Sequence, residues 1–189
     1  MSASAISAFD VASKLAAALE EAGVPYAIGG AIALGAWSDP RATHDVDINL
    51  FVGHEELSTA LDALAAAGLV IDREAARLAD QAGDVLVGRY EGLRVDLFTP
   101  SIPFAWEALS TRRRLAGPSG EAWYLSPEAT AVFKLLFFRS KDLVDVERLV
   151  AVQGADLDRE YIRRWLVEMM GALDERVQAF DRIVASCPP

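Results

Sequence analysis

The segment Ala27–Val52, AIGGAIALGAWSDPRATHDVDINLFV, determines what fold this sequence is expected to form. It begins in a short apolar run that ends at Gly29 and Gly30. The small residues of Ala31–Trp37 predict a short helix after the glycines, and a Ser-Asp-Pro turn then leads into a strand at about Asp45–Leu50. The sequence therefore predicts a strand–helix–strand unit.

The second strand of this unit carries acidic residues at alternate positions. Asp45, Asp47 and Asn49 share one face, because successive side chains of a strand point to opposite faces, and the apolar residues between them share the other. Two carboxylates this close on a half-buried strand repel each other and resist removal from water. A divalent cation between them would remove that cost, so Asp45 and Asp47 are candidate metal ligands.

The glycine pair suits a phosphate group. Gly29 and Gly30 stand at a strand end, where no side chain keeps a ligand away from the backbone. The helix that follows directs free N–H groups and the positive end of its dipole to the same place. A phosphate cradle and an acidic pair in one unit are the equipment for transferring a nucleotidyl or phosphoryl group. The alternative is a surface strand with two solvated aspartates beside a tight Gly-Gly turn.

The spacing from Gly29-Gly30 to Asp45-Val46-Asp47 resembles the signature of the DNA polymerase beta-like nucleotidyltransferase superfamily. The run RATHDVD at residues 41–47 is most similar to the AbiEii-type branch, known from abortive infection and bacterial toxin–antitoxin pairs. We expect an α/β fold, α+β in some schemes. It would be a small, mixed, strongly twisted sheet of the nucleotidyltransferase fold, with a C-terminal helical bundle.

A third acidic residue is predicted on a hairpin. Residues 85–90 and 93–98 read as its two arms, with Glu91-Gly92 as the turn. Asp96 lies in the second arm between apolar neighbours, at the place where the resembled superfamily carries its third carboxylate. Taken alone, Asp96 would be a surface acid. Beside Asp45 and Asp47, a role in the site is favoured.

A helix is predicted to begin at Ser126-Pro127-Glu128, with Ser as N-cap, Pro at the first position and an acid in the first turn. Lys134 lies in the third turn as a lone cation among apolar residues. Burying it without an anion would be costly, so it should snorkel to solvent or face a cleft that holds an anion. We expect it to face the acidic strand, where a bound triphosphate is one such anion.

The segment FKLLFFRSKDLVDV at residues 133–146 also resembles the AbiEii-type branch, whose C-terminal helices carry a Lys and then an Arg/Lys-Asp followed by a second Asp. The resemblance implies that Lys141 and Asp142 line the nucleotide side of the cleft. For Lys141 and Asp145, four residues apart, a plain ion pair on the helix surface is the alternative.

The rest of the chain is expected to be mostly helical. Helices are predicted at residues 5–22, 55–67, 141–152, 158–170 and 173–185, a helical turn or two at 73–78, and short strands at 69–71 and 122–125. Prolines and glycines make residues 99–120 loop-rich, with a short helix around Phe104. We expect a nucleotidyltransferase core at residues 1–120 and a helical region at 121–189 that closes the cleft.

Composition limits the function classes. The chain has 189 residues and a net charge of −10, which argues against a general nucleic-acid coat. Its one cationic run, Arg112–Arg114, is expected to be a solvated loop. The N-terminus lacks the basic region of a signal peptide, and no apolar run is long enough for a membrane span. The single cysteine, Cys187, permits no disulfide framework, so a cytoplasmic location is the default.

Together these patterns and the resemblance predict metal-dependent nucleotidyl transfer from an NTP. Asp45, Asp47 and Asp96 would hold Mg²⁺ or Mn²⁺, and Asp96 would also help to deprotonate the acceptor hydroxyl. Gly29 and Gly30 would take the β- and γ-phosphates.

Two cations complete this hypothesis: Arg41 and Lys134 would neutralise charge on the triphosphate and on the pyrophosphate leaving group. The resemblance implies a toxin with an RNA (tRNA) or protein hydroxyl as acceptor, and a cognate antitoxin as partner. A small-molecule acceptor, as in antibiotic nucleotidyltransferases, stays open. The alternative from another class is a non-catalytic, antitoxin-like partner-binding module on the same fold.

Overall fold

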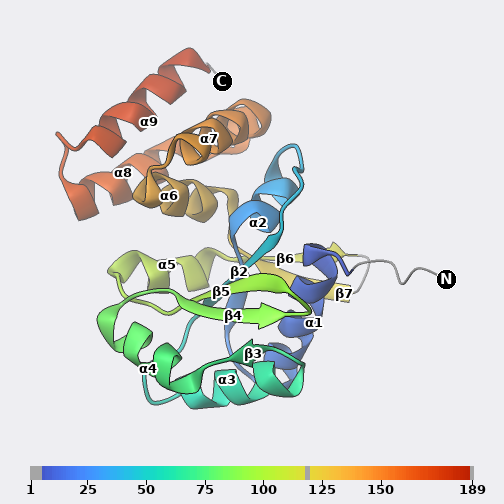
Figure 1. The fold of residues 1–189 in the computed structure, drawn as a ribbon. Coiled ribbons are helices and arrows are strands. Elements are labelled where there is room, and N and C mark those ends of the chain that lie inside the picture. Colours follow the sequence, from blue (N-terminus) through green and yellow to red (C-terminus); the bar gives the residue numbers. More distant parts are fainter. Residues whose placement is uncertain (1–5, 118–119, 188–189) are drawn as a thin grey trace.

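The computed structural model describes residues 6–117 and 120–187, and within them the chain forms a seven-stranded mixed sheet with helices on both faces (Figure 1). The strands are β1 (Tyr26–Ile28), β2 (Asp45–Leu50), β3 (Val70–Ile71), β4 (Leu86–Tyr90), β5 (Leu93–Phe98), β6 (Arg113–Gly117) and β7 (Gly120–Tyr124). The helices are α1 (Ala8–Glu21), α2 (Gly30–Trp37), α3 (Leu57–Ala66), α4 (Arg73–Ala82), α5 (Pro103–Thr111), α6 (Pro127–Phe137), α7 (Ser140–Gln153), the 3₁₀ turn η1 (Gly154–Asp156), α8 (Arg159–Met170) and α9 (Glu175–Ser186).

The acidic strand β2 lies in the middle of the sheet, whose strand order is β3-β4-β5-β2-β1-β7-β6. It runs antiparallel to β1 and parallel to β5. The register of β2 and β5 pairs Asp47 with Asp96. The topology therefore brings the third predicted carboxylate beside the first two.

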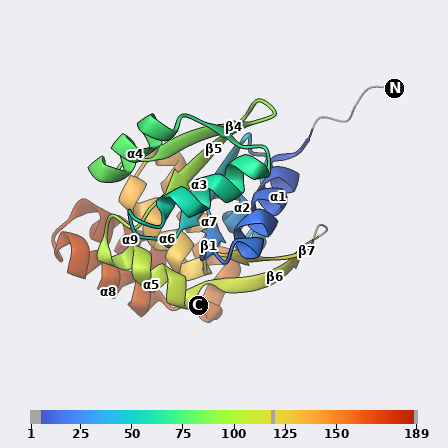
Figure 2. The same ribbon diagram turned by 90° about the horizontal axis from the view of Figure 1, so that it is seen from below.

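The helices form two layers. Helices α1 and α3 pack on one face of the sheet, as the view from below shows (Figure 2). Helix α2 lies on the opposite face, where α6 and α7 pack against it, and α8 and α9 complete the C-terminal group (Figure 1). The predicted fold class, a mixed sheet with a C-terminal helical bundle, is confirmed.

Local sequence signals explain several element boundaries. Ser7 caps α1: its hydroxyl accepts from the amide of Asp10, whose carboxylate accepts from the amide of Ser7 in return. The predicted start of this helix at residue 5 lies outside the described residues. Ser126 caps α6 as predicted and accepts from the amide of Ala129 at 3.1 Å. The turn between β4 and β5 has Glu91 and Gly92 at positive φ, as a two-residue hairpin of this type requires.

The segment from Thr99 to Gly120 is more ordered than the sequence predicted: the short helix around Phe104 is present as the longer α5, and the strand β6 was not predicted. Pro103 stands at the first turn of α5, where its missing N–H costs nothing. The expected solvated arginine loop is wrong for the same reason: β6 pairs with β7, and Arg112 stacks on Trp123 and donates to the carbonyl oxygen of Tyr26 at 3.0 Å. Arg114 pairs with Glu20 and Glu121, so two of the three arginines of this run are held by protein partners.

The sheet and the C-terminal helices meet near residue 125. Strand β7 pairs with β1 and continues the sheet to Tyr124, and the C-terminal helices begin at Pro127.

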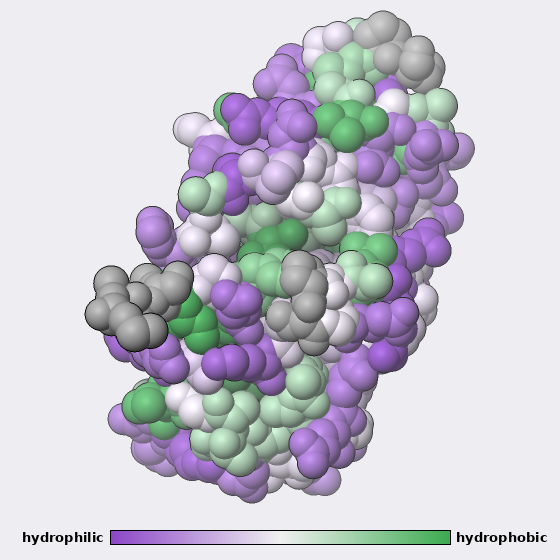
Figure 3. Space-filling model, turned by 90° about the vertical axis from the view of Figure 1, so that its right-hand side faces the viewer, coloured by the Kyte–Doolittle hydropathy of each residue, from purple (hydrophilic) through white to green (hydrophobic). Residues whose placement is uncertain are grey.

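The face of the molecule in Figure 3 is largely hydrophilic around its border, with paler and hydrophobic residues gathered toward the middle. Among the described residues, no helix is long and apolar enough to cross a membrane.

Candidate active site

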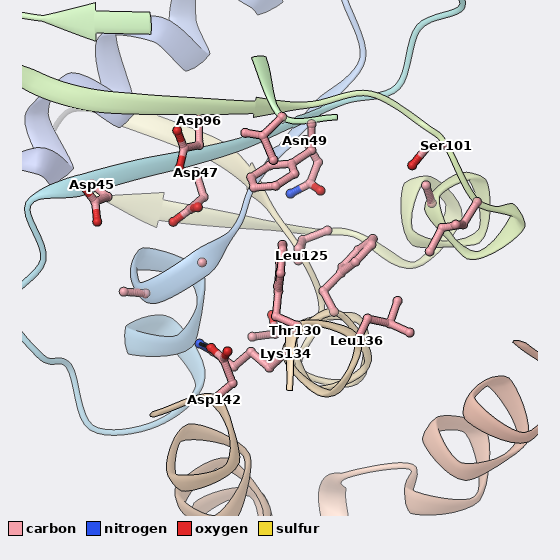
Figure 4. A pocket seen from close by; sticks show the side chains of 18 of the residues that line it. Asp45, Asp47, Asn49, Asp96, Ser101, Leu125, Thr130, Lys134, Leu136 and Asp142 are labelled. Carbon is pink, nitrogen blue, oxygen red and sulfur yellow. Dashed lines mark ion pairs between the residues drawn. The ribbon is translucent and has the colours of Figure 1, made fainter. Parts of the chain in front are cut away.

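A cavity of about 410 Å³ lies between the acidic strands and α6, a size typical of small-molecule sites. It is lined by every residue that the sequence predicted for the site except Gly29: Gly30, Arg41, Asp45, Asp47, Asp96, Lys134, Lys141 and Asp142. Figure 4 shows the three acidic side chains on neighbouring strands, with Lys134 and Asp142 across the cavity. Residues that are distant in sequence thus share one cavity.

Asp47 is the central acidic residue of the cluster. It is partly buried, whereas Asp45 is exposed at the start of β2 and the side chain of Asp96 is 16% exposed. Burial, followed by the charges of Asp96 and Asp45, raises the pKa of Asp47 to about 6, against the opposing charges of Lys134 and Arg139. Ionised Asp47 is therefore disfavoured by its burial and by two neighbouring acids.

The donor set of this cluster fits a hard divalent cation, because carboxylate oxygens are the ligands that Mg²⁺ and Mn²⁺ prefer. The raised pKa of Asp47 comes first from burial and then from repulsion by Asp96 and Asp45, both of which a bound cation would offset. Even so, no three His, Cys, Asp or Glu side chains in residues 6–117 and 120–187 are grouped closely enough to form a finished metal site. One oxygen of Asp96 is engaged by Arg94, whose Nε donates to it at 2.7 Å. The acids are therefore suitable ligands that are not yet arranged around a cation.

The two glycines are required by the acidic strand itself. Gly30 has φ of +56°, and a Cβ at this position would lie 1.8 Å from Oδ2 of Asp47. A Cβ at Gly29 would lie 2.6 Å from Nδ2 of Asn49. The amide of Gly29 donates to the carbonyl oxygen of Asp47 at 2.9 Å. The Gly-Gly pair thus lets the start of α2 approach Asp47. From the sequence, the two glycines were explained only by a bound phosphate.

Lys134 lines the cavity as predicted, but its anion belongs to the protein. The residue is 6% exposed, and Nζ donates to Oδ2 of Asp145 at 2.7 Å. Arg41 binds the same carboxylate with two hydrogen bonds, of 3.3 Å and 3.1 Å. Asp145 therefore fixes both cations that the sequence assigned to the triphosphate. The alternative of an ion pair between Lys141 and Asp145 is wrong, because the buried carboxylate of Asp145 is paired with Lys134 and Arg41 instead.

Asp142 is a buried acid that pairs with two cations of the cavity wall. It is 1% exposed and accepts two hydrogen bonds from the side chain of Arg139, of 2.6 Å and 3.1 Å, and one from the Arg139 amide at 3.2 Å. Nζ of Lys134 lies 3.6 Å from Oδ1 of Asp142. These cations keep the pKa of Asp142 below its usual value despite the opposing effect of burial. Lys141, one residue earlier, is exposed at the cavity wall. Asp142 thus holds cations in place more than it offers a surface to a ligand.

The sequence did not predict Asp145, Arg139 or the buried hydroxyl of Thr130 as parts of the site. A buried lysine needs a counter-ion, and two aspartates three residues apart on one helix were the signal for it. Thr130 is 2% exposed, and its Oγ1 has no hydrogen-bond partner among the described residues. Only its place on the same face of α6 as Lys134 indicated it in advance.

The sequence also missed an apolar wall of the same cavity. Its members come from β5, the segment after it and α6: Phe98, Ile102, Phe133, Leu136 and Phe137. The rings of Phe98 and Phe137 meet edge to face, with centroids 5.9 Å apart. In Figure 4, Leu125, Leu136 and Ser101 lie on the opposite side of the cavity from Asp45. The cavity therefore has a charged end and an apolar end.

Comparisons with known proteins support the fold. No known family profile matches the chain, and no curated protein matches it in sequence. Among solved structures, it is similar to the antibiotic-resistance factor ANT(2'')-Ia in solution, with 16% identity over 89% of this chain and 96% of that chain and a TM-score of 0.56. The crystal structure of ANT(2")-Ia in complex with adenylyl-2"-tobramycin gives 14% identity, 89% and 94% coverage and a TM-score of 0.55.

A third similar structure is an antigenic nucleotidyltransferase-like protein from Paracoccidioides brasiliensis, with 19% identity, 93% and 94% coverage and a TM-score of 0.50. At these identities the likeness shows a shared fold. The predicted nucleotidyltransferase fold is confirmed in this way, while the AbiEii-type branch stays a prediction.

Proposed function

We propose that this protein is a metal-dependent nucleotidyltransferase, which moves an NMP from an NTP to a hydroxyl group. The observation that carries the proposal is Asp47, an acid with a pKa of about 6, placed between Asp45 and Asp96 in a cavity whose other wall carries Lys134. Excess negative charge facing positive charge across a cavity suits a metal–triphosphate complex. A partner-binding module has no use for carboxylates kept at this energetic cost.

In this proposal the three acids have related roles. Asp45, Asp47 and Asp96 would hold Mg²⁺ or Mn²⁺, which when bound supplies Lewis-acid stabilisation of the transferred phosphoryl group. Asp96 accepts from Arg94 through one oxygen, so its second oxygen is free to help remove the proton of the acceptor hydroxyl.

The triphosphate would lie between the start of α2 and α6. Gly29, the N-cap of α2, makes no side-chain capping hydrogen bond, which leaves the first amides of this helix open to an anion. Arg41 and Lys134, preset by their shared carboxylate Asp145, would neutralise the leaving pyrophosphate. Lys141 would add charge at the cavity wall.

The acceptor and the biological role belong to this proposal too. The resemblance to the AbiEii-type branch favours a cytoplasmic toxin that acts on RNA (tRNA) or a protein hydroxyl and is held by an antitoxin. The neighbour solved with adenylyl-2"-tobramycin favours a small molecule. The net charge of −10 and the internally paired Arg112 and Arg114 weaken the case for RNA.

Binding of NTP and metal tests the proposal without knowledge of the acceptor. Each NTP, with Mg²⁺ and at millimolar concentration, should raise the melting temperature of the wild type by mass action for at least one nucleotide. Asp47→Asn should remove this increment, and Asp62→Asn, which alters an exposed acid on α3, should retain it. A wild type that gains nothing from any NTP with metal contradicts the proposal.

A further inference from the structure

The acidic groups that line the cavity are gathered toward one end of it. The acids are the three on β2 and β5 together with Asp142, which is already paired with Arg139. The far end is formed by the apolar wall defined above, and its rim includes Phe137 and Met170, which are 49% and 39% exposed. Among the described lining residues, this end offers no carboxylate to a polycation. Its cation is Arg139, whose guanidinium lies 5.0 Å from the ring centre of Phe137 and is already paired with Asp142.

The geometry of the proposed reaction indicates which substrate the apolar end would bind. In phosphoryl and nucleotidyl transfer the attacking and leaving oxygens lie roughly in line on opposite sides of the phosphorus. In the proposed reaction Arg41, Lys134 and Lys141 would hold the pyrophosphate at the charged end of the cavity. The apolar end is then the part of the cavity that remains for the body of an acceptor whose hydroxyl reaches Asp47 and Asp96.

The orphaned hydroxyl of Thr130 lies between the two ends. Thr130, Phe133, Lys134 and Phe137 all line the cavity from one face of α6, since residues three and four apart are neighbours on a helix. Thr130 is therefore flanked by Lys134 on one side and the phenylalanines on the other. A buried hydroxyl without a partner is unfavourable, and a polar atom of a ligand would satisfy it.

We propose that the acceptor is an uncharged small molecule with an aromatic or branched apolar body and a free hydroxyl. The apolar wall binds its body, and the hydroxyl of Thr130 binds its polar group beside Asp47. This inference rests on the proposed nucleotidyl transfer. It makes polycationic aminoglycosides and RNA poor acceptors.

The first test uses the wild type with Mg²⁺ and a non-hydrolysable α,β-methylene ATP. Saturation-transfer NMR would measure 2-phenylethanol as a neutral aromatic alcohol and tobramycin as a polycation. The alcohol should bind alongside the nucleotide analogue, and tobramycin should bind at least ten-fold more weakly. Phe137→Ser should lower the affinity for the alcohol about five-fold or more. Val144→Ser is the matched control, because Val144 is 45% exposed on α7 and does not line the cavity.

Three results would overturn the inference: displacement of the alcohol by the nucleotide analogue, tighter binding of tobramycin, or equal effects of the two serine variants. Absence of alcohol binding while the analogue binds also refutes it and leaves the proposed function intact. Absence of analogue binding refutes the proposed function instead.

A second variant tests the hydrogen bond. Thr130→Val keeps the shape of the side chain and removes the hydroxyl. The melting temperature of the unliganded protein should stay equal or rise, and binding of the ATP analogue should be unchanged. The affinity for 2-phenylethanol in the ternary complex should fall about three-fold or more. A lower melting temperature would show a structural partner for this hydroxyl, and weaker binding of the analogue would place Thr130 in the nucleotide site. Either result would remove Thr130 from acceptor recognition.

Discussion

Replacing Asp47 by Asn should stabilise the unliganded protein while destroying the site. The fold raises the pKa of this carboxyl from 3.8 to about 6 through burial and the charges of Asp96 and Asp45. One pKa unit corresponds to about 1.4 kcal/mol, so ionising Asp47 in the folded protein costs about 3 kcal/mol at neutral pH. Asn has almost the same shape and no charge, and it should recover most of this free energy.

The pH dependence gives the sign of the effect. Because the pKa of Asp47 is higher in the folded than in the unfolded state, the folded state binds more protons between about pH 4 and about pH 6. The contribution of Asp47 to the stability of the wild type therefore falls as pH rises through this window. Asp47→Asn lacks that dependence, so the two proteins should be equally stable near pH 4 and diverge by up to about 3 kcal/mol near pH 8.

The assay is denaturant and thermal unfolding of both proteins across this pH range, in buffer with a chelator. For a chain of this length the difference near pH 8 corresponds to a rise in melting temperature of about 6–12 °C. Asp62→Asn is the control, since Asp62 is exposed and pairs only with Arg73 on the surface among the described residues. An Asp47→Asn protein that is no more stable than the wild type near pH 8, or a difference that does not change with pH, would refute the reasoning.

Three further variants test the neighbouring groups. Lys134→Met should lower the free energy of unfolding by about 2 kcal/mol, because it removes one of the two cations paired with the buried Asp145 and leaves only Arg41. Adding Asp145→Asn should recover stability but no activity. Denaturant titration and a transfer assay check this, and full stability of the single variant would count against the pair. Gly30→Ala should weaken NTP binding, measured by calorimetry. Gly92→Ala, also at positive φ but with open space around it, should cost about 1–2 kcal/mol of stability and leave NTP affinity unchanged. Equal NTP affinities of the two variants would exclude Gly30 from the site. Arg41→Lys keeps the charge but breaks the two-point contact with Asp145, and NTP affinity should fall about ten-fold with little change in melting temperature; an unchanged affinity would exclude Arg41 from phosphate binding.

The sequence predicted best those features that depend on neighbouring residues. Alternation along β2 and β5 predicted which faces Asp45, Asp47 and Asp96 occupy, because the period of a strand is local. The Glu91-Gly92 turn and the Ser126 cap were predicted for the same reason. Each of these signals lies within a few residues of the structure it produces.

Features that depend on tertiary packing were missed. Asp145 binds Arg41 from 104 positions away, and the local pattern offered a competing pair with Lys141. Residues 99–120 were predicted to be loop-rich with one short helix around Phe104, although α5 runs from Pro103 to Thr111 and β6 pairs with β7. The apolar wall was also missed, because Phe98 and Phe137 meet only when β5 and α6 are brought together.

The most direct test of nucleotidyl transfer is the fate of the phosphates of the NTP. The protein would be incubated with Mg²⁺ and an NTP labelled on either the α- or the γ-phosphate, with RNA, protein and small-molecule fractions of a cell lysate supplied separately. The account predicts that the α-label becomes attached to one fraction, that the γ-label is released as pyrophosphate, and that Asp47→Asn does neither. Attachment of the γ-label, or α-label transfer that survives in Asp47→Asn, would contradict it.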